Sequence, residues 1–498
     1  MSHDPADHSG LWSPGRRALT TGLVLTVTLV ASESLAVSNI MPIVDRDLGA
    51  GNSDLYGWVF SGFFLGNLIG IVVAGLLIDR GSLVRAFVLG LTLFSVGLLV
   101  GGLAPSMPIL VAARFVQGLG SGAIPPVAYV SIGRALPEAL RPRMFATLST
   151  AWVLPGVIGP ALAGLIADTF HWRLVLLGLL PLIGVAGLMT LPAIAAVGPA
   201  AVAEGEDAEA AESGRRLPFA LMLAAGAAMV VAGLTDARPI PGLPLVVAGV
   251  LLGVPAFRRL TPAGTLRAAR GLPAAVLLRG ILTFAFFTAD VYVALALQGW
   301  RGTSATVAGL ALTAATLSWT AGAWTQAHYI GRFGERPFIR AGFAVLALGV
   351  LGFMAILSPA VPLPVGVAAW AVAGLGMGFA YSPLSLTVLR EAPPESQGAA
   401  TAGLQLSDVL GTSLGSGVGG ALIAFGHREG AEPWVGLAWA FGIGVAVALF
   451  GVVLAGRLSA WRPTADSAPI VDAASAAAAA PAAPGAPAAS GQQTDPTR

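Results

Sequence analysis

Long apolar runs separated by short polar segments make up most of the chain. A helix that crosses a bilayer needs about 20 mostly apolar residues, and runs of about this length occur fourteen times. They lie near residues 18–42, 57–78, 84–103, 109–133, 144–167, 172–196, 218–234, 241–257, 272–298, 303–330, 337–358, 362–389, 398–425 and 434–456. Glycine and proline inside the runs are compatible with helix, because both are commoner in membrane helices than in soluble ones. The pattern predicts an all-α polytopic membrane protein with fourteen spans.

The runs at 218–234 and 241–257 are the shortest, at about 17 residues each, which is the lower limit for a span. They follow an acidic, alanine-rich segment that contains Glu204, Glu206 and Asp207. Either these two runs cross the membrane or they lie in its surface as a hairpin, and the later runs keep the same orientation in both cases. We expect them to cross.

Composition narrows the class of protein. Of the 498 residues, 56% are apolar and 10% are charged, whereas a soluble domain is about 25% charged. A soluble enzyme, a nucleic-acid-binding protein and a secreted disulfide scaffold are excluded on this ground. Cysteine is absent, and the five histidines fall in loops, tails or the ends of runs. We therefore expect neither a metal site nor a cofactor.

All 27 basic residues are arginine, and their distribution sets an orientation. With a cytoplasmic N-terminus, the cytoplasmic segments hold 19 arginines and the opposite segments hold 5. Arg114 and Arg279 lie inside runs, and Arg498 ends the chain. Membrane proteins carry such an excess of basic residues on the cytoplasmic side, so we predict that both termini are cytoplasmic.

The sequence aligns with itself when it is shifted by 256 positions. The matched positions are Gly118–Gly120 with Gly374–Gly376, Pro137 with Pro393, Gly159 with Gly415, and Asp79-Arg80 with Glu335-Arg336. One long period over several runs indicates a duplicated six-helix bundle with two helices inserted between the copies. The predicted segments are a cytoplasmic tail (1–17), an N-terminal bundle (18–196), an acidic loop (197–217), two extra helices with a linker (218–271), a C-terminal bundle (272–457) and a disordered Ala/Pro-rich tail (458–498). Transporters built from repeats bind substrate near the midplane, between the repeats.

Four short motifs follow one another in the first half. They are Gly75–Arg80 with Arg85 after the second run, Arg114–Gly118 in the fourth, Gly156–Gly164 in the fifth, and Glu33 nine residues before Pro42 in the first. Their order along the chain, which begins with the Glu33 motif, and the repeat resemble the major facilitator superfamily, in particular its fourteen-helix drug:proton antiporter branch. The resemblance implies the fold of that family, two six-helix halves plus two inserted helices, in a bacterial cytoplasmic (inner) membrane.

Three acids fall inside predicted spans: Glu33, Asp290 and Asp408. An ionised side chain at bilayer depth is costly and is therefore a candidate functional group. Glu33 shifted by 256 lands on Ala289, next to Asp290, so each half presents a carboxyl group from an equivalent helix. Burial disfavours the charged form, so such an acid can take up a proton on one side and release it on the other. The alternative is a carboxyl group that only holds helices together, through hydrogen bonds to neighbours such as Ser32.

Arg114 cannot lose its proton and must stay paired inside the fourth span. We interpret it as the partner of Glu33 in proton coupling, and the alternative is a tether to backbone carbonyls. Arg279 lies near the cytoplasmic start of its span, and we interpret it as an anchor that reaches the surface.

Two further sets of residues are predicted to act through conformation. A latch at the inner mouth, remade as the halves rock, consists of Asp79, Arg80, Arg85, Glu335 and Arg336. Close helix packing and a local kink are expected at Gly156, Gly159, Pro160 and Gly164. Their connection with export is implied by the resemblance alone.

Polar and aromatic residues inside the runs could line a substrate cavity, the alternative for any single aromatic residue being a lipid-facing or interfacial position. The candidates are Asn39, Gln117, Trp152, Phe287, Tyr292, Trp319 and Tyr381. With the acids and the resemblance, they predict a monomeric transporter that exports hydrophobic or amphiphilic small molecules by alternating access, driven by the proton gradient. Two alternatives remain: the same fold exporting an endogenous metabolite or lipid, and a membrane scaffold or receptor that transports nothing.

Overall fold

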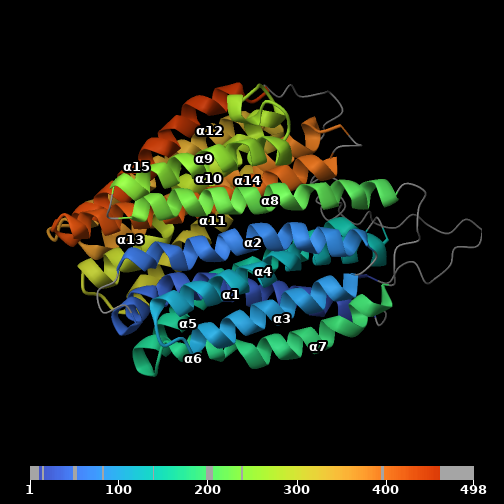
Figure 1. Cartoon of the computed structure of the whole chain (residues 1–498), viewed down its shortest axis with the longest axis horizontal. Coiled ribbons are helices and arrows are strands. Elements are labelled where there is room, and N and C mark those ends of the chain that lie inside the picture. Colours follow the sequence, from blue (N-terminus) through green and yellow to red (C-terminus); the bar gives the residue numbers. More distant parts are fainter. Residues whose placement is uncertain are drawn as a thin grey trace, which may run out of the picture.

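The computed structural model describes residues 10–13, 16–48, 53–80, 83–137, 140–197, 206–236, 239–393 and 397–459. Within these ranges every regular element is a helix, and the long helices run side by side along one axis (Figure 1). Residues 198–205 of the predicted acidic loop and 460–498 of the predicted C-terminal tail lie outside the described ranges.

The first half consists of α1 (Arg17–Leu48), η2 (Ser53–Leu55), α2 (Tyr56–Asp79), α3 (Leu83–Gly102), α4 (Met107–Ala135), α5 (Arg141–Thr169), α6 (Arg173–Leu177) and α7 (Leu179–Ala196). Two helices and a short turn follow: α8 (Glu206–Thr235), α9 (Pro239–Leu260) and η4 (Thr265–Arg267). The second half consists of α10 (Leu272–Ala294), η5 (Leu295–Trp300), α11 (Ala305–Phe333), α12 (Glu335–Met354), η6 (Ala355–Leu357), α13 (Leu363–Glu391), α14 (Gln397–Arg428), α15 (Pro433–Leu454) and η8 (Ala455–Arg457).

Each of the fourteen predicted runs coincides with helix in the described residues. Twelve of these helices are long and apolar enough to cross a membrane. Of the other two helices, α11 is rich in Ala, Gly, Ser and Thr, and α5 contributes only the apolar segment Ile158–Thr169 because several of its side chains lie outside the described residues. Small and hydroxyl residues are typical of tight helix–helix interfaces in membranes, and these two helices pack against each other. The helix α8 begins at Glu206, within the predicted acidic loop rather than at 218.

The repeat seen in the sequence is also present in the helices. The bounds of α4 shifted by 256 are the bounds of α13, and both helices have 29 residues. At Gly120 a side chain would overlap the backbone of Phe94 on α3, and at Gly376 it would overlap the backbone of Leu346 on α12. The matched glycines therefore allow the same close helix packing in both halves.

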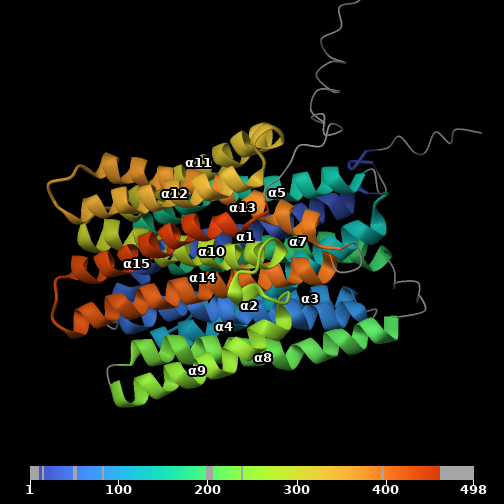
Figure 2. The same ribbon diagram turned by 90° about the horizontal axis from the view of Figure 1, so that it is seen from above.

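Two seams join the halves: α5 packs on α11, and α2 packs on α14. We call the end of the bundle where α1 begins the proximal end and the end where α1 ends the distal end. The α8–α9 pair lies beside α2 along one edge of the bundle (Figure 2), and α8 also contacts α14. Buried residues from all four helices, such as Leu68, Leu223, Phe257 and Leu406, form one apolar cluster. The α8–α9 pair therefore covers the α2–α14 seam.

Candidate functional site

The first candidate site is a buried ion pair in the N-terminal half. Glu33 on α1 is 0% exposed and Arg114 on α4 is 2% exposed. Arg114 Nη1 donates to Glu33 Oε1 and, at 2.7 Å, to Gln117 Oε1. Its Nε donates to the carbonyl oxygen of Val59 on α2 at 3.4 Å, and its Cζ lies 4.2 Å from the ring centroid of Phe63. The structure thus brings together the two residues that the sequence analysis paired.

The spacing of Arg114, Gln117 and Gly118 in the motif Arg114–Gly118 has a physical basis at this site. Arg114 and Gln117 are one helical turn apart, which places both side chains on one face of α4. At Gly118 a side chain would overlap the backbone of Phe63, so glycine lets α2 approach α4 closely. That approach brings the backbone of Val59 and the ring of Phe63 within reach of the guanidinium.

The hydrogen bonding of this pair is incomplete. Glu33 Oε2 and Gln117 Nε2 are buried, and neither atom has a hydrogen-bond partner among the described residues. Unpartnered buried polar atoms are costly and are uncommon outside functional sites and water sites. Arg114 keeps several contacts apart from Glu33, so the arrangement tolerates either charge state of the carboxyl group.

Asp290 is the acid of the second half, on α10. It is 9% exposed, and no described residue donates a hydrogen bond to its carboxyl group or forms an ion pair with it. It lies one turn beyond Phe286 and Phe287 on the same face of the helix. This buried acid is therefore surrounded by aromatic rather than basic groups on its own helix.

The third acid, Asp408 on α14, corrects one sequence-based interpretation. Arg279 was expected to reach the membrane surface, yet it is 2% exposed, and its Nε donates to Asp408 Oδ1 at 3.0 Å. Arg279 lies about 10 Å along α10 from its first residue, and its guanidinium bonds to groups inside the bundle instead of extending toward the helix end. Its Nη1 also donates to the carbonyl oxygen of Tyr381 at 2.5 Å and to Ser385 Oγ at 3.3 Å, both on α13.

A continuous series of aromatic contacts connects the two halves. Phe64 on α2 lies 5.9 Å from Phe287, which lies 5.2 Å from Phe286 on α10. Phe286 lies 5.7 Å from Trp319 on α11, and Trp319 lies 5.4 Å from Tyr381 on α13, centroid to centroid. We call these five rings the aromatic wall. Phe64, Phe287, Trp319 and Tyr381 are half-buried, whereas Phe286 is buried.

Other candidate cavity residues lie elsewhere. Tyr292 is 0% exposed, and its hydroxyl donates to the carbonyl oxygen of Ser416 at 2.5 Å, so it packs between α10 and α14 rather than lining a cavity. Gln117 belongs to the Arg114 site, and Asn39 is 0% exposed. The side chain of Trp152 lies outside the described residues.

Asn39 is the centre of a junction at the distal end. Its Nδ2 donates to the carbonyl oxygens of Pro160 on α5, at 2.7 Å, and Ala305 on α11, at 2.9 Å. Its own carbonyl accepts from Gln298 Nε2 on η5 at 2.7 Å. A Cβ atom at Gly164 would lie 2.6 Å from the Ala305 oxygen and 2.8 Å from Asn39 Nδ2. Glycine and proline of the predicted packing motif therefore bring the halves together.

The remaining motif glycines differ from each other. At Gly156 a side chain would overlap Thr316 on α11, whereas at Gly159 the nearest atom is the carbonyl oxygen of Ser32, 3.8 Å away. Gly156 is thus a close cross-half contact, and Gly159 has room for a methyl group.

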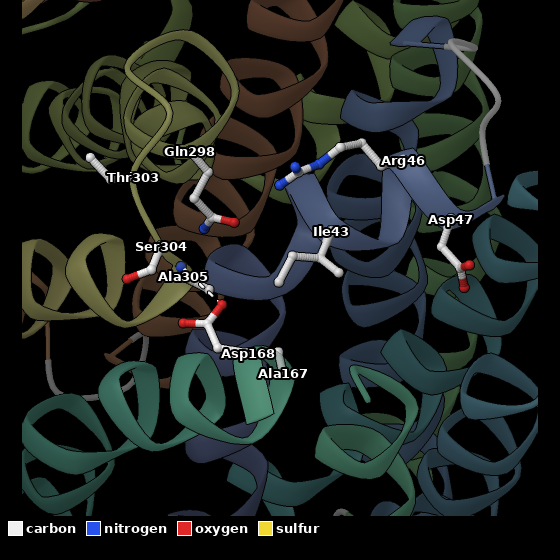
Figure 3. Close-up of a pocket in the computed structure, with 9 residues that line it drawn as sticks. All are labelled: Ile43, Arg46, Asp47, Ala167, Asp168, Gln298, Thr303, Ser304 and Ala305. Atoms are coloured by element: carbon white, nitrogen blue, oxygen red, sulfur yellow. Dashed lines mark hydrogen bonds between the residues drawn. The ribbon is translucent and has the colours of Figure 1, made fainter. Parts of the chain in front are cut away.

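Asp168 closes the same junction from α5. Its carboxylate accepts from the backbone N–H groups of Ala305 at 3.3 Å and Thr306 at 3.0 Å, and from Thr306 Oγ1 at 2.8 Å. An acid at a helix N-terminus is favourable because it meets unpaired N–H groups and the positive end of the helix dipole. An open pocket of about 540 Å³ lies beside it (Figure 3). The pocket is lined by Ile43, Arg46, Asp47, Ala167, Asp168, Gln298, Thr303, Ser304 and Ala305.

The second seam is also joined toward the distal end. Tyr56 donates to the carbonyl oxygen of Val291 at 3.4 Å, and Ser61 donates to the carbonyl oxygen of Ser413 at 2.9 Å. A side chain at Gly57 would lie 3.0 Å from the Cα atom of Gly420. Among the described residues, the close contacts found at both seams therefore lie in the distal halves of the helices.

At the proximal end, one residue of the predicted latch forms an ion pair. Glu335 pairs with Arg390 at the end of α13, at 2.5 Å to each carboxylate oxygen. Arg80 and Arg85 are exposed. The side chain of Asp79 lies outside the described residues. Among the described residues, no cluster of His, Asp and Glu could hold a metal ion.

The major facilitator superfamily model matches residues 22–297, which is more than half of the chain. The chain belongs to the major facilitator superfamily. Residues that resembled the motifs of this family, Arg114 and Gly164 among them, lie within the matched part.

Curated relatives of the chain include two proteins of Mycobacterium tuberculosis. One, described as a probable multidrug-efflux transporter, is 26% identical over 84% of this chain and 91% of its own length. The multidrug resistance protein Stp is 27% identical over 83% of this chain and 77% of its own length.

Solved structures show the same superfamily fold. A D-xylose–proton symporter covers 87% of this chain and 97% of its own, with a TM-score of 0.62 at 15% identity. At that identity the likeness concerns the fold alone. Family, relatives and apolar helices together make the protein a multi-pass membrane transporter rather than an enzyme.

Proposed function

We propose that this transporter is a proton-coupled exporter of hydrophobic or amphiphilic small molecules that works by alternating access. The observation that carries the proposal is the buried Glu33–Arg114 pair, in which one carboxylate oxygen has no partner. The relatives described as multidrug-efflux proteins support the substrate class.

Protonation of Glu33 would change the contacts between α1 and α4. The ionised carboxylate attracts Arg114, whereas the neutral acid loses that attraction. Arg114 stays charged and retains Gln117, the Val59 carbonyl oxygen and the Phe63 ring as partners. The pair therefore has two arrangements, and a proton taken up on one side can bias the choice between them.

Asp290 supplies the second carboxyl group of the proposed cycle. It has no basic partner among the described residues, so its negative charge is uncompensated when it ionises. A proton or a cationic substrate would supply the missing positive charge. Its place beside Phe286 and Phe287 favours a substrate that is both hydrophobic and positively charged.

The arrangement of the seams supports alternating access. Rocking of the halves requires contacts that form at one end while those at the other end are broken. The junctions around Asn39 and Ser61 hold the distal end closed. With a cytoplasmic N-terminus, for which the arginine distribution is evidence, the distal end faces outward across a bacterial inner membrane.

The direct test of the proposed function is efflux from cells that lack other pumps. A panel of hydrophobic cations, neutral drugs and lipids is measured with the wild-type protein, with Glu33→Gln and with Asp290→Asn. We expect concentrative efflux of hydrophobic cations that Glu33→Gln abolishes. The exposed Glu429→Gln serves as the matched control. Full efflux by Glu33→Gln would contradict the coupling role, and transport of lipids alone would favour an endogenous substrate.

A second experiment tests the distal closure. Gly164→Val places a side chain against Ala305 and Asn39, whereas Gly159→Ala adds a methyl group where the nearest atom is 3.8 Å away. Because cysteine is absent, Thr303→Cys introduces a single label site. We expect an impermeant thiol reagent to label this site faster in Gly164→Val and at the unchanged rate in Gly159→Ala. Equal rates in all three proteins would contradict the closure.

A further inference from the structure

The Arg279–Asp408 pair lies apart from the proposed coupling pair and is surrounded differently. Both carboxylate oxygens of Asp408 have partners: Oδ1 accepts from Arg279 and Oδ2 accepts from the hydroxyl of Tyr381 at 3.0 Å. Thr283 and Thr412 each donate to its backbone carbonyl, at 2.9 and 3.0 Å. An acid held this completely keeps the groups that bond to it in fixed positions.

Tyr381 is fixed by this pair at three points. Its hydroxyl donates to Asp408, its backbone carbonyl accepts from Arg279, and its ring centroid lies 3.2 Å from the Arg279 Cζ atom. Guanidinium groups stack favourably on aromatic faces. The ring can therefore neither tilt nor shift along α13 without breaking a charge-assisted contact.

The fixed ring is one end of the aromatic wall. Trp319 packs edge-on against Tyr381, and Phe286 packs edge-on against Trp319. Phe286 is 4% exposed and stacks on the buried Trp370. Phe286 is held in the core and cannot move. A change in the position of the Tyr381 ring would therefore change the shape of the rest of the aromatic wall.

The pair also faces the opposite half. Tyr129 on α4 is 46% exposed and interacts electrostatically with Arg279. Asp408 retains 14% exposure of its side chain. The Tyr381 end of the wall therefore borders accessible space, where a bound molecule can touch it.

We propose that Arg279 and Asp408 are a positioning pair that fixes the ring of Tyr381 and, through Trp319, sets the shape of the aromatic wall and hence which hydrophobic molecules are accepted. This inference rests on the proposed export function. It assigns specificity to a charge pair that does not carry the coupling proton. Planar aromatic cations fit a wall of edge-on rings better than bulky spherical ones, because flat faces allow ring stacking.

The test uses two probes, planar ethidium and near-spherical tetraphenylphosphonium, with the purified protein in liposomes under a proton gradient. The variants are Tyr381→Phe, which keeps the ring and removes the bond to Asp408, and Asp408→Asn. Loss of one hydrogen bond to a charged group changes an equilibrium constant by about tenfold. We expect KM for ethidium to rise by about this factor, KM for tetraphenylphosphonium to change less than about threefold, and kcat to be kept. Tyr329→Phe, on the exposed part of α11, is the matched control.

Three results would overturn the inference. Equal changes of KM for both probes, or none, would show that the wall does not select by shape. A fall in kcat alone for both probes would indicate a purely structural pair. A changed pH dependence in Asp408→Asn would make Asp408 a proton carrier. Absence of transport of either probe by the wild-type protein would instead contradict the proposed function.

Discussion

Each half of the protein buries one arginine with one acid, and the two pairs are built differently. In the N-terminal half, Glu33 is 0% exposed and one of its oxygens has no partner. In the C-terminal half, both oxygens of Asp408 are bonded and its side chain is 14% exposed. An incompletely bonded acid can change its charge state with a small loss of contacts, whereas a fully bonded one holds its neighbours in place. The difference indicates coupling in the first half and positioning in the second.

The largest expected effect is that of Arg114→Met on stability. It leaves Glu33 buried without its counter-charge, which costs about 3 to 5 kcal/mol of unfolding free energy. The measurement is an SDS titration in mixed micelles. The double variant with Glu33→Gln removes both charges and should recover most of the loss without restoring transport. If the double variant is no more stable than Arg114→Met, the loss does not come from an uncompensated charge on Glu33.

Arg279→Met is the matching change in the other half, and a smaller loss is expected. Asp408 keeps the hydrogen bond from Tyr381, and its side chain is 14% exposed. We therefore expect the unfolding free energy to fall by about 1 to 3 kcal/mol in the same titration. A loss as large as that of Arg114→Met would remove the contrast between the two pairs.

Glu335→Gln probes the ion pair at the proximal end, where Arg390 has a side-chain exposure of 35%. Accessible pairs contribute little because water screens them, so unfolding free energy should fall by less than about 1 kcal/mol. The effect should shrink further at high salt. A fall in unfolding free energy that does not depend on salt would show that the Glu335–Arg390 pair behaves as a buried ion pair.

Asp290→Asn should have the smallest effect on stability. No described residue bonds to this carboxyl group, so the substitution removes no partner, and unfolding free energy should stay within about 0.5 kcal/mol of the wild-type value. Efflux of hydrophobic cations should nevertheless fall. A clear loss of stability would reveal a partner for Asp290.

Much of the fold could be predicted from the sequence, because lipid demands long apolar helices whatever their packing. The period of 256 relates α4 to α13 residue for residue. Glu33 and Arg114 could be paired because each is a costly charge that needs a partner inside the bundle. Among the described helices, α11 has the composition least typical of a span, because it is rich in Ala, Gly, Ser and Thr.

The contacts of the second half could not be predicted in the same way. Arg279 and Asp408 are 129 positions apart, and the repeat supplies no counterpart for either, since the matching positions hold Leu23 and Trp152. The position of Arg279 well inside the predicted span was the one feature of the sequence that indicated a buried partner for this arginine. The partner of Glu335 is Arg390, which follows 55 positions later and which the sequence pattern did not single out. The partner Arg390 matches Arg134 of the first half.

Substrate-induced proton flux into liposomes that contain the purified protein and ethidium distinguishes a coupling role of Glu33 from a positioning role of Asp408. We expect flux with the wild-type protein, none with Glu33→Gln, and an unchanged number of protons per ethidium with Asp408→Asn. Flux retained by Glu33→Gln would rule out proton coupling through Glu33, and a proton ratio altered by Asp408→Asn would make Asp408 part of the coupling.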